Sequence, residues 1–475
     1  MAKWANIPIE VKTPILQLVG ESAIYAAVCR EWQAILEPKH FGRIILSQRR
    51  LPTLSKDQEE KSPQETSRNY EIFQGALMDL FTILTDWKEP QDLNDKGLTL
   101  ELCKYSPSDS EHALKENNFA HDPYSEPSED FRGPAMEKND THRWQRGFYT
   151  VDQRPWGLPR RVSIEQKQRF MRVNLPSRGI SRVFPKVDIV TTLLIRRQYY
   201  RDFEPQTLRQ IFKSLVKLVS FTYERPAFIH PNGKICCVHQ DAFSYLAGTL
   251  KQLAIFQDHN EKVRQIMYSG YGGAQDAGEL QWKRILERSH AMGLVRKSRN
   301  LEHFSMSFFT DADDFFYAFW PWNNGVSFDW KWEKLTTFAH TSKHLNPSQA
   351  REKVNDLLEA AGTAAKSMPK LRVMEIWNGK NDSHGCLFRY CTDDTSSTIT
   401  WKSSWDMELE SRVIDCWTKT AYQNTRYENV GIVYEPLPMD GTHFPASVLR
   451  HLQLKDKIVH PVSFSQIELL GAPRT

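Results

Sequence analysis

Apolar residues recur along the chain with two different periods, and each period predicts one kind of element. A spacing of three or four residues predicts amphipathic helices, and this spacing covers residues 73–87, 208–218, 350–361 and 409–421. Alternation or a short apolar run predicts strands, which cover residues 43–47, 98–102, 187–195 and 430–434. The chain is therefore expected to fold as an α/β protein.

One motif, a leucine followed by apolar residues three and five positions later, recurs through the middle of the chain. It is complete at Leu250, Leu301 and Leu371, and weaker copies begin at Leu215 and Leu335. The starts lie 34 to 51 residues apart, and helical stretches fill several of the intervals. Stacked strand-plus-helix repeats show this pattern, because each unit buries its apolar face only against its neighbours.

The pattern resembles a leucine-rich-repeat array, although its spacing exceeds the roughly 20–29 residues of regular repeats. Gly379 also stands where the family consensus has Asn after Leu371. An irregular leucine-rich-repeat-like solenoid is therefore predicted, and a doubly wound α/β domain is the alternative. The clearest helix of the array is expected to open with Asn346 as its cap and Pro347, and to end before Pro369.

The pattern changes in the last hundred residues. Residues 386–391 and 397–405 alternate on either side of Asp393-Asp394-Thr395, which predicts an antiparallel hairpin. A short last helix is expected over residues 444–452. Every solenoid needs its open end covered, so the hairpin and this helix are expected to cap the array.

Residues 4–41 form a separate pattern at the start of the chain. Two short apolar stripes of helical period occur there, at Pro8, Val11, Ile15 and Leu18 and at Val28, Trp32, Ile35 and Leu36, with a third short helix expected at residues 22–27. Three helices of this length share little interior, because small domains bury a smaller fraction of their surface. A partner protein is therefore expected.

This segment resembles an F-box. Ile7-Pro8 with Glu10, Ile15-Leu16 with Leu18, and Val28-Cys29-Arg30-Glu31-Trp32 follow the order of that family's Leu-Pro-x-Glu, Ile-Leu-x-x-Leu and Val-Cys-Lys-x-Trp elements. The resemblance implies that a Skp-type linker docks on Ile7, Pro8, Ile15, Leu16, Leu18, Val28, Cys29 and Trp32. Pro14 departs from the pattern, since an interior proline costs a helix about 3 kcal/mol. Thr13 as cap and Pro14 as first helical residue would permit a later start.

Most of the chain is similar to a large group of uncharacterised fungal F-box proteins, a resemblance that brings no known substrate. The residues that carry it include Phe319-Trp320-Pro321-Trp322, Met374-Glu375-Ile376-Trp377-Asn378-Gly379 and Ile399-Thr400-Trp401. The expected organisation is an F-box-like segment at residues 1–50, a linker at 51–68, the α/β array at 69–379 with a polar loop insertion at 106–146, and the cap at 380–475.

Composition excludes several classes of protein. In 475 residues, 62 Lys and Arg against 58 Asp and Glu leave a net charge of only +4, so no nucleic-acid partner is expected. No apolar run reaches the roughly 18–20 residues of a membrane span, and no signal peptide is evident, so no membrane partner and a cytoplasmic or nuclear location are expected. Seven cysteines without framework spacing favour reduced intracellular thiols.

The strongest enzymatic signal is Asp311-Ala312-Asp313-Asp314, which follows an apolar strand. Carboxylates in this position hold a divalent ion in nucleotide-sugar transferases. The same residues suit the first turn of a helix, with Asp311 as cap, and we favour that interpretation. A glycine-rich loop at residues 270–273 and the cluster His230, Cys236, Cys237 and His239 lack the spacing of a dinucleotide or zinc site.

Together these features predict an adaptor that performs no bond chemistry and needs no metal or cofactor. By resemblance it would be the substrate-recognition subunit of an SCF-type cullin ubiquitin ligase, bound through the Skp-type linker. The target protein would lie on the polar positions that alternate with the apolar ones, such as His303, Ser305 and Glu375. The alternatives are a metal-dependent glycosyl- or nucleotidyl-transferase using Asp311 and Asp313, and an F-box-like scaffold outside ubiquitin ligation.

Overall fold

The computed structural model describes residues 63–86, 97–102, 144–145, 148–149, 183–197, 203, 205–226, 242–258, 291–323, 330–381, 384–438 and 445–471. Several predicted features lie outside these residues: the F-box-like segment at 4–41, the strand at 43–47, nearly all of the insertion at 106–146, the cluster at 230–239 and the loop at 270–273.

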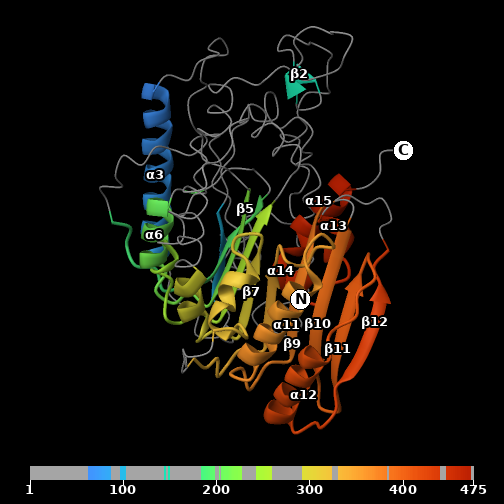
Figure 1. Cartoon of the computed structure of the whole chain (residues 1–475). Coiled ribbons are helices and arrows are strands. Elements are labelled where there is room, and N and C mark those ends of the chain that lie inside the picture. The colour runs from blue at the N-terminus through green and yellow to red at the C-terminus, as the bar shows by residue number, and fades with distance from the viewer. Residues whose placement is uncertain are drawn as a thin grey trace, which may run out of the picture.

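Ten of the described strands form one open sheet (Figure 1). They are β1 (Leu98–Glu101), β4 (Val190–Ile195), β5 (Ser220–Pro226), β6 (Gln252–Asp258), β7 (His303–Ser307), β8 (Thr337–Thr341), β9 (Val373–Asn381), β10 (His384–Thr392), β11 (Ser397–Ser403) and β12 (Gly431–Pro436). Their order in the sheet is their order in the chain. Two shorter strands, β2 (Trp144–Gln145) and β3 (Phe148–Tyr149), pair separately.

Every copy of the leucine motif leads into a strand, including the two weak copies. Leu215, Leu250, Leu301, Leu335 and Leu371 are all buried, and β5 to β9 follow them in turn. All neighbours from β1 to β9 are parallel. A doubly wound sheet reverses its strand order at a switch point, whereas this order runs in one direction only.

Alternate strand residues point to opposite faces of the sheet. Helices cover one of these faces, which we call the first face, and the other is the second face. The covering elements are α3 (Pro63–Asp86), α6 (Pro205–Ser214), α10 (Ala312–Phe315), η7 (Tyr317–Phe319), α11 (Arg351–Ala365) and α12 (Ser411–Thr425). Phe304, Phe338 and Met374 from three adjacent strands lie in the main apolar core with residues of these helices. The predicted inward positions of the motif are therefore confirmed.

The C-terminal helices have a different place from the predicted one. α13 (Ala446–Leu449), α14 (Lys455–Ile458) and α15 (Pro461–Gly471) belong to one segment, residues 446–471, which we call the C-terminal strap. α13 packs on β9 and β10, and α14 packs on β6 and β7. The strap thus crosses the second face of the sheet and does not cap an end of the array. It covers Phe256, Trp377 and Leu387, the apolar side chains of a second core.

The predicted hairpin is confirmed, whereas two helix starts differ from prediction. β10 and β11 pair antiparallel around residues 393–396. α11 begins after Ala350, because Asn346 instead accepts hydrogen bonds from the N–H and hydroxyl of Ser348 and closes a turn of its own. α3 begins at Pro63, inside the predicted linker.

No helix in the described part of the chain is long and apolar enough to cross a membrane.

Candidate functional site

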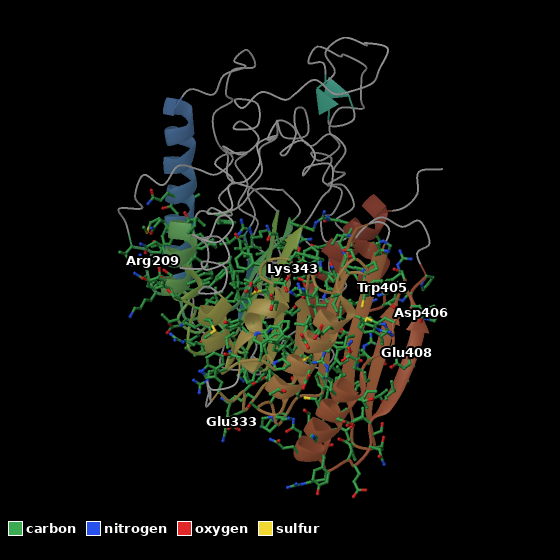
Figure 2. The ribbon with its side chains drawn as sticks, in the orientation of Figure 1. Arg209, Glu333, Lys343, Trp405, Asp406 and Glu408 are labelled. Atoms are coloured by element: carbon green, nitrogen blue, oxygen red, sulfur yellow. The ribbon has the colours of Figure 1, made fainter. Side chains whose placement is uncertain are left out.

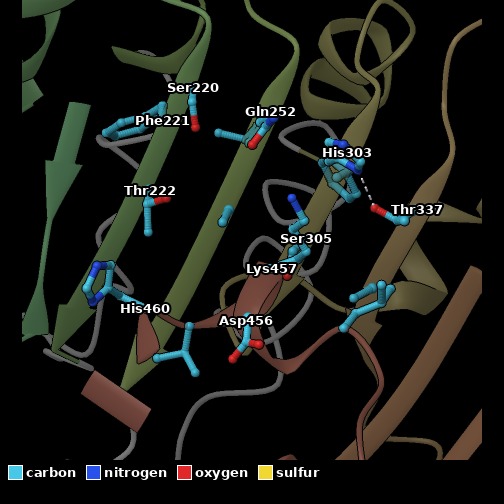
Figure 3. A pocket seen from close by; sticks show the side chains of 16 residues that line it. Ser220, Phe221, Thr222, Gln252, His303, Ser305, Thr337, Asp456, Lys457 and His460 are labelled. Carbon is cyan, nitrogen blue, oxygen red and sulfur yellow. Dashed lines mark hydrogen bonds between the residues drawn. The ribbon is translucent and has the colours of Figure 1, made fainter. Parts of the chain in front are cut away.

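A pocket of about 120 Å³ lies on the second face of the sheet, between β5–β8 and the strap (Figure 3). We call it the second-face pocket. The first residues of the four strands, Ser220, Gln252, His303 and Thr337, lie in register and form a polar row across it. The next row on this face is Thr222, Ala254, Ser305 and Ala339, whose small side chains leave the hollow.

The strap forms the other wall of the pocket. Leu454 and Val459 contribute apolar side chains, and Asp456, Lys457 and His460 contribute polar ones. Asp456 and Lys457 are exposed, so the pocket is open to solvent on that side. Hydroxyls, an ammonium group and imidazoles together suit a small polar ligand.

The structure brings two of the predicted target-binding residues, His303 and Ser305, into this pocket. His303 Nδ1 lies 2.8 Å from Thr337 Oγ1. Burial, and then the positive charge of Lys457, lower the pKa of the His303 imidazole below its ordinary value. The imidazole is therefore neutral at pH 7. Ser305 Oγ is buried and has no hydrogen-bond partner among the described residues.

The third predicted target-binding residue, Glu375, has a different role. Its side chain is fully buried and bonds Arg389 Nε at 2.7 Å. Its two carboxylate oxygens also accept hydrogen bonds from the backbone N–H groups of Gln453 (2.9 Å) and Leu454 (3.0 Å) in the strap. The prediction that Glu375 is open to a target protein is therefore wrong. It lies on the predicted face, but the strap covers that face here.

A second buried carboxylate anchors the other end of the pocket wall, and the sequence provided no signal for it. Glu224 of β5 accepts hydrogen bonds from the backbone N–H of His460 (2.6 Å) and from the Ser463 hydroxyl, both in the strap. The Arg197 N–H donates to it as well (3.2 Å). Burial raises the pKa of Glu224 above its ordinary value, against the opposing effect of these donors.

The Asp311–Asp314 run caps a helix, as predicted. Asp311 Oδ1 accepts from the N–H of Asp313 at 3.0 Å and from the Ser342 hydroxyl at 2.8 Å, and Oδ2 accepts from the N–H of Lys343 at 2.8 Å. Asp313 Oδ2 lies 3.1 Å from His344 Nε2. Asp311 thus ties the loop after β7 to the loop after β8. Within the described ranges, no group of three or more His, Cys, Asp or Glu side chains is placed to hold a metal ion.

The residues predicted to dock the Skp-type linker, Ile7, Pro8, Ile15, Leu16, Leu18, Val28, Cys29 and Trp32, lie outside the described part of the chain. Their arrangement stays a prediction. The three described cysteines, Cys386, Cys391 and Cys416, form no disulfide with one another.

Residues 245–460, which include β6 to β12 and most of the pocket wall, are similar to a family described as a family of unknown function (DUF6546). No curated protein matches the chain. No solved structure matches it either.

Proposed function

We propose that this protein is a substrate-recognition adaptor of an SCF-type cullin ubiquitin ligase. Residues 4–41 would dock the Skp-type linker, and the α/β domain would hold a target protein. The observation that carries the proposal is the order of three motif elements in that segment, ending in Val28-Cys29-Arg30-Glu31-Trp32. Such an adaptor catalyses no step itself. It raises the effective concentration of target lysines near the conjugating enzyme, in the cytoplasm or nucleus.

The α/β domain supports the proposal in one respect. Its parallel strands follow one another in chain order from β1 to β9, as they do in leucine-rich-repeat-like stacked units. Arrays of this kind present long surfaces to protein partners. We therefore propose that the repeat units form an irregular solenoid whose role is recognition.

Co-expression with a Skp-type linker tests the docking step. The double variant Leu16→Asp/Leu18→Asp should lose co-purification with the linker, because docking would bury unpaired charges. The single variant Lys12→Glu changes the charge by the same two units at a polar position and should retain the linker. Thermal unfolding of each variant shows whether the α/β domain is intact. Equal linker recovery with the wild type and a folded double variant would contradict the proposal.

A further inference from the structure

The strand β12 is an open edge of the sheet. Among the described strands it pairs only with β11, and none of them pairs with its other side (Figure 1). All six of its residues are exposed, including Ile432 (37%), Val433 (38%) and Tyr434 (47%). The opposite edge, β1, is only four residues long and ends in buried residues. Soluble proteins normally blunt a long apolar edge, because unpaired N–H and C=O groups there recruit another strand.

The backbone of β12 presents a regular set of hydrogen-bonding groups to this open side. The Leu437 N–H donates to the Ser403 carbonyl at 2.8 Å, so the N–H groups of alternate residues, such as Val433, also point to β11. The N–H and C=O groups of Ile432 and Tyr434 therefore point away from the sheet. Pro436, which has no N–H, has the same outward orientation, the orientation in which a sheet tolerates proline.

Acidic side chains outnumber basic ones on the segments next to this edge, where Arg426 and Lys402 are the basic residues. Asp406 and Glu408 lie beside β12 (Figure 2), in the segment whose Leu409 N–H donates to the Tyr434 hydroxyl at 3.2 Å. Both are exposed, as is Glu428 just before the strand. Glu435 lies on the strand itself and bonds Lys402 across the ladder at 3.2 Å. A second copy of this chain would bring the same negative charges to the edge, which disfavours self-association there.

From these observations we infer that the free edge of β12 binds an extended, positively charged peptide segment of another protein by β-strand addition. The outward groups of Ile432 and Tyr434 supply the main-chain ladder, and the acidic side chains select the charge. As the place of target capture, the inference rests on the proposed adaptor function. The binding step itself needs no linker and can be measured alone.

The test uses the full chain and a fluorescein-labelled Lys-Val-Lys-Val-Lys-Val-Lys peptide in fluorescence anisotropy. We expect saturable binding that weakens as salt is raised. A Glu-Val peptide of the same length carries negative charge in place of positive charge, and a Lys-Pro peptide lacks the alternate N–H donors. Both should bind at least tenfold more weakly.

Two variants connect binding to β12. Ile432→Pro removes an outward N–H and leaves the bonds to β11, so it should weaken binding of the Lys-Val peptide at least tenfold. The N–H of Val433 points to β11, so the affinity of Val433→Thr for this peptide should lie within twofold of the wild-type affinity. The variant Asp406→Asn/Glu408→Gln should reduce both the affinity and its salt dependence. Thermal unfolding confirms that each protein is folded.

Three results would overturn the inference: no saturable binding of the Lys-Val peptide to folded wild type, equal affinity in folded Ile432→Pro, or a wild-type dimer that Ile432→Pro abolishes. The last result would assign the edge to a second copy. Linker co-purification by Ile432→Pro distinguishes the two proposals. If Ile432→Pro loses the peptide but retains the linker, the result supports peptide binding at the β12 edge. If the wild type binds the peptide but does not dock the linker, only the role of the edge in target capture is removed.

Discussion

His340 lies in a setting that keeps its imidazole uncharged. It is fully buried on the first face of the sheet, and its ring centre lies 5.7 Å from that of Phe315 and 6.0 Å from that of Phe338. Its Nδ1 is 3.0 Å from the Thr341 carbonyl, which requires the proton on Nδ1, and Thr310 Oγ1 lies 3.3 Å from Nε2. Burial lowers the pKa of His340 to about 4, although the nearby Asp311 carboxylate opposes the change.

This lowered pKa predicts a loss of stability in mild acid. Well above pH 6.5 the imidazole is neutral in both the folded and the unfolded chain, so the free energy of unfolding is not reduced by its titration. As the pH falls from about 6.5 to about 4, only the unfolded chain binds the proton, and the free energy of unfolding decreases by about 3 kcal/mol in total. Urea unfolding at pH 7 and pH 4.5 measures this, with His340→Gln as the comparison.

The variant His340→Gln cannot titrate, so its stability should fall less between these two pH values than that of the wild type. Glu224, whose raised pKa acts in the opposite direction, is present in both proteins and cancels in the difference. Equal pH dependence of the two proteins would show that His340 titrates normally.

At the scale of single elements, the strap depends on a few polar anchors. Glu375 reaches it from β9 and Glu224 from β5, and Arg389 of β10 adds a bond to the His451 carbonyl at 2.6 Å. Each carboxylate accepts two hydrogen bonds from the strap: Glu375 from the N–H groups of Gln453 and Leu454, and Glu224 from the His460 N–H and the Ser463 hydroxyl. The strap is therefore placed by polar pairing as well as by its apolar core.

Glu375→Gln should release part of the strap. The substitution keeps the size of the side chain but leaves Arg389 without its buried counter-charge, so we expect a loss of about 3 kcal/mol in the free energy of unfolding. Glu435→Gln breaks the exposed pair with Lys402 and should cost less than about 1 kcal/mol. Urea unfolding measures both values.

Hydrogen exchange shows where the Glu375→Gln effect lies. Faster exchange should be concentrated at Gln453 and Leu454, whose N–H groups lose their charged acceptor. Unchanged exchange at these two positions would show that Glu375 does not anchor the strap.

The sequence predicted the strands better than the cover of the sheet. The leucine motif places a buried residue shortly before each strand and sets which side chains point inward, and both properties are local. Local pattern also favoured Asp311 as a cap, which is confirmed. The cover over Glu375 comes from residues about 80 positions later, and Glu224 meets the strap across 236 residues. The spacing of apolar residues along the sequence carries no information about such distant contacts. The pocket and the anchoring roles of Glu375 and Glu224 were therefore not predicted.

At the scale of the whole molecule, the described domain has three layers: first-face helices, the sheet, and the strap (Figure 1). The two cores differ in origin. The first core forms between strands and helices that follow one another in the chain. The second core forms only when the strap closes over Phe256, Trp377 and Leu387. Phe308, a partly buried residue with the left-handed φ of 62°, packs edge-on against Phe256 and Trp377 in this second core.

Removal of the strap should therefore expose apolar surface without abolishing the sheet. A chain ending at residue 438 should retain its far-ultraviolet circular dichroism, bind an apolar dye such as anilinonaphthalene sulfonate, and aggregate on concentration. A chain ending at residue 471 keeps the strap and should behave as the wild type. Absence of dye binding by the shorter chain would show that the second face is covered in another way.

The long separation between Glu224 and the strap also has a consequence for synthesis on the ribosome. β5 to β9 can stack one after another as they emerge, since each contacts the strand made just before it. The second face cannot close until residues 446–471 have been made, and His460 in that segment lies 236 residues after its partner Glu224. At about 5–20 residues per second, the growing chain carries exposed Phe256 for roughly ten seconds or longer. During that interval nascent-chain chaperones have a binding site that the finished protein hides.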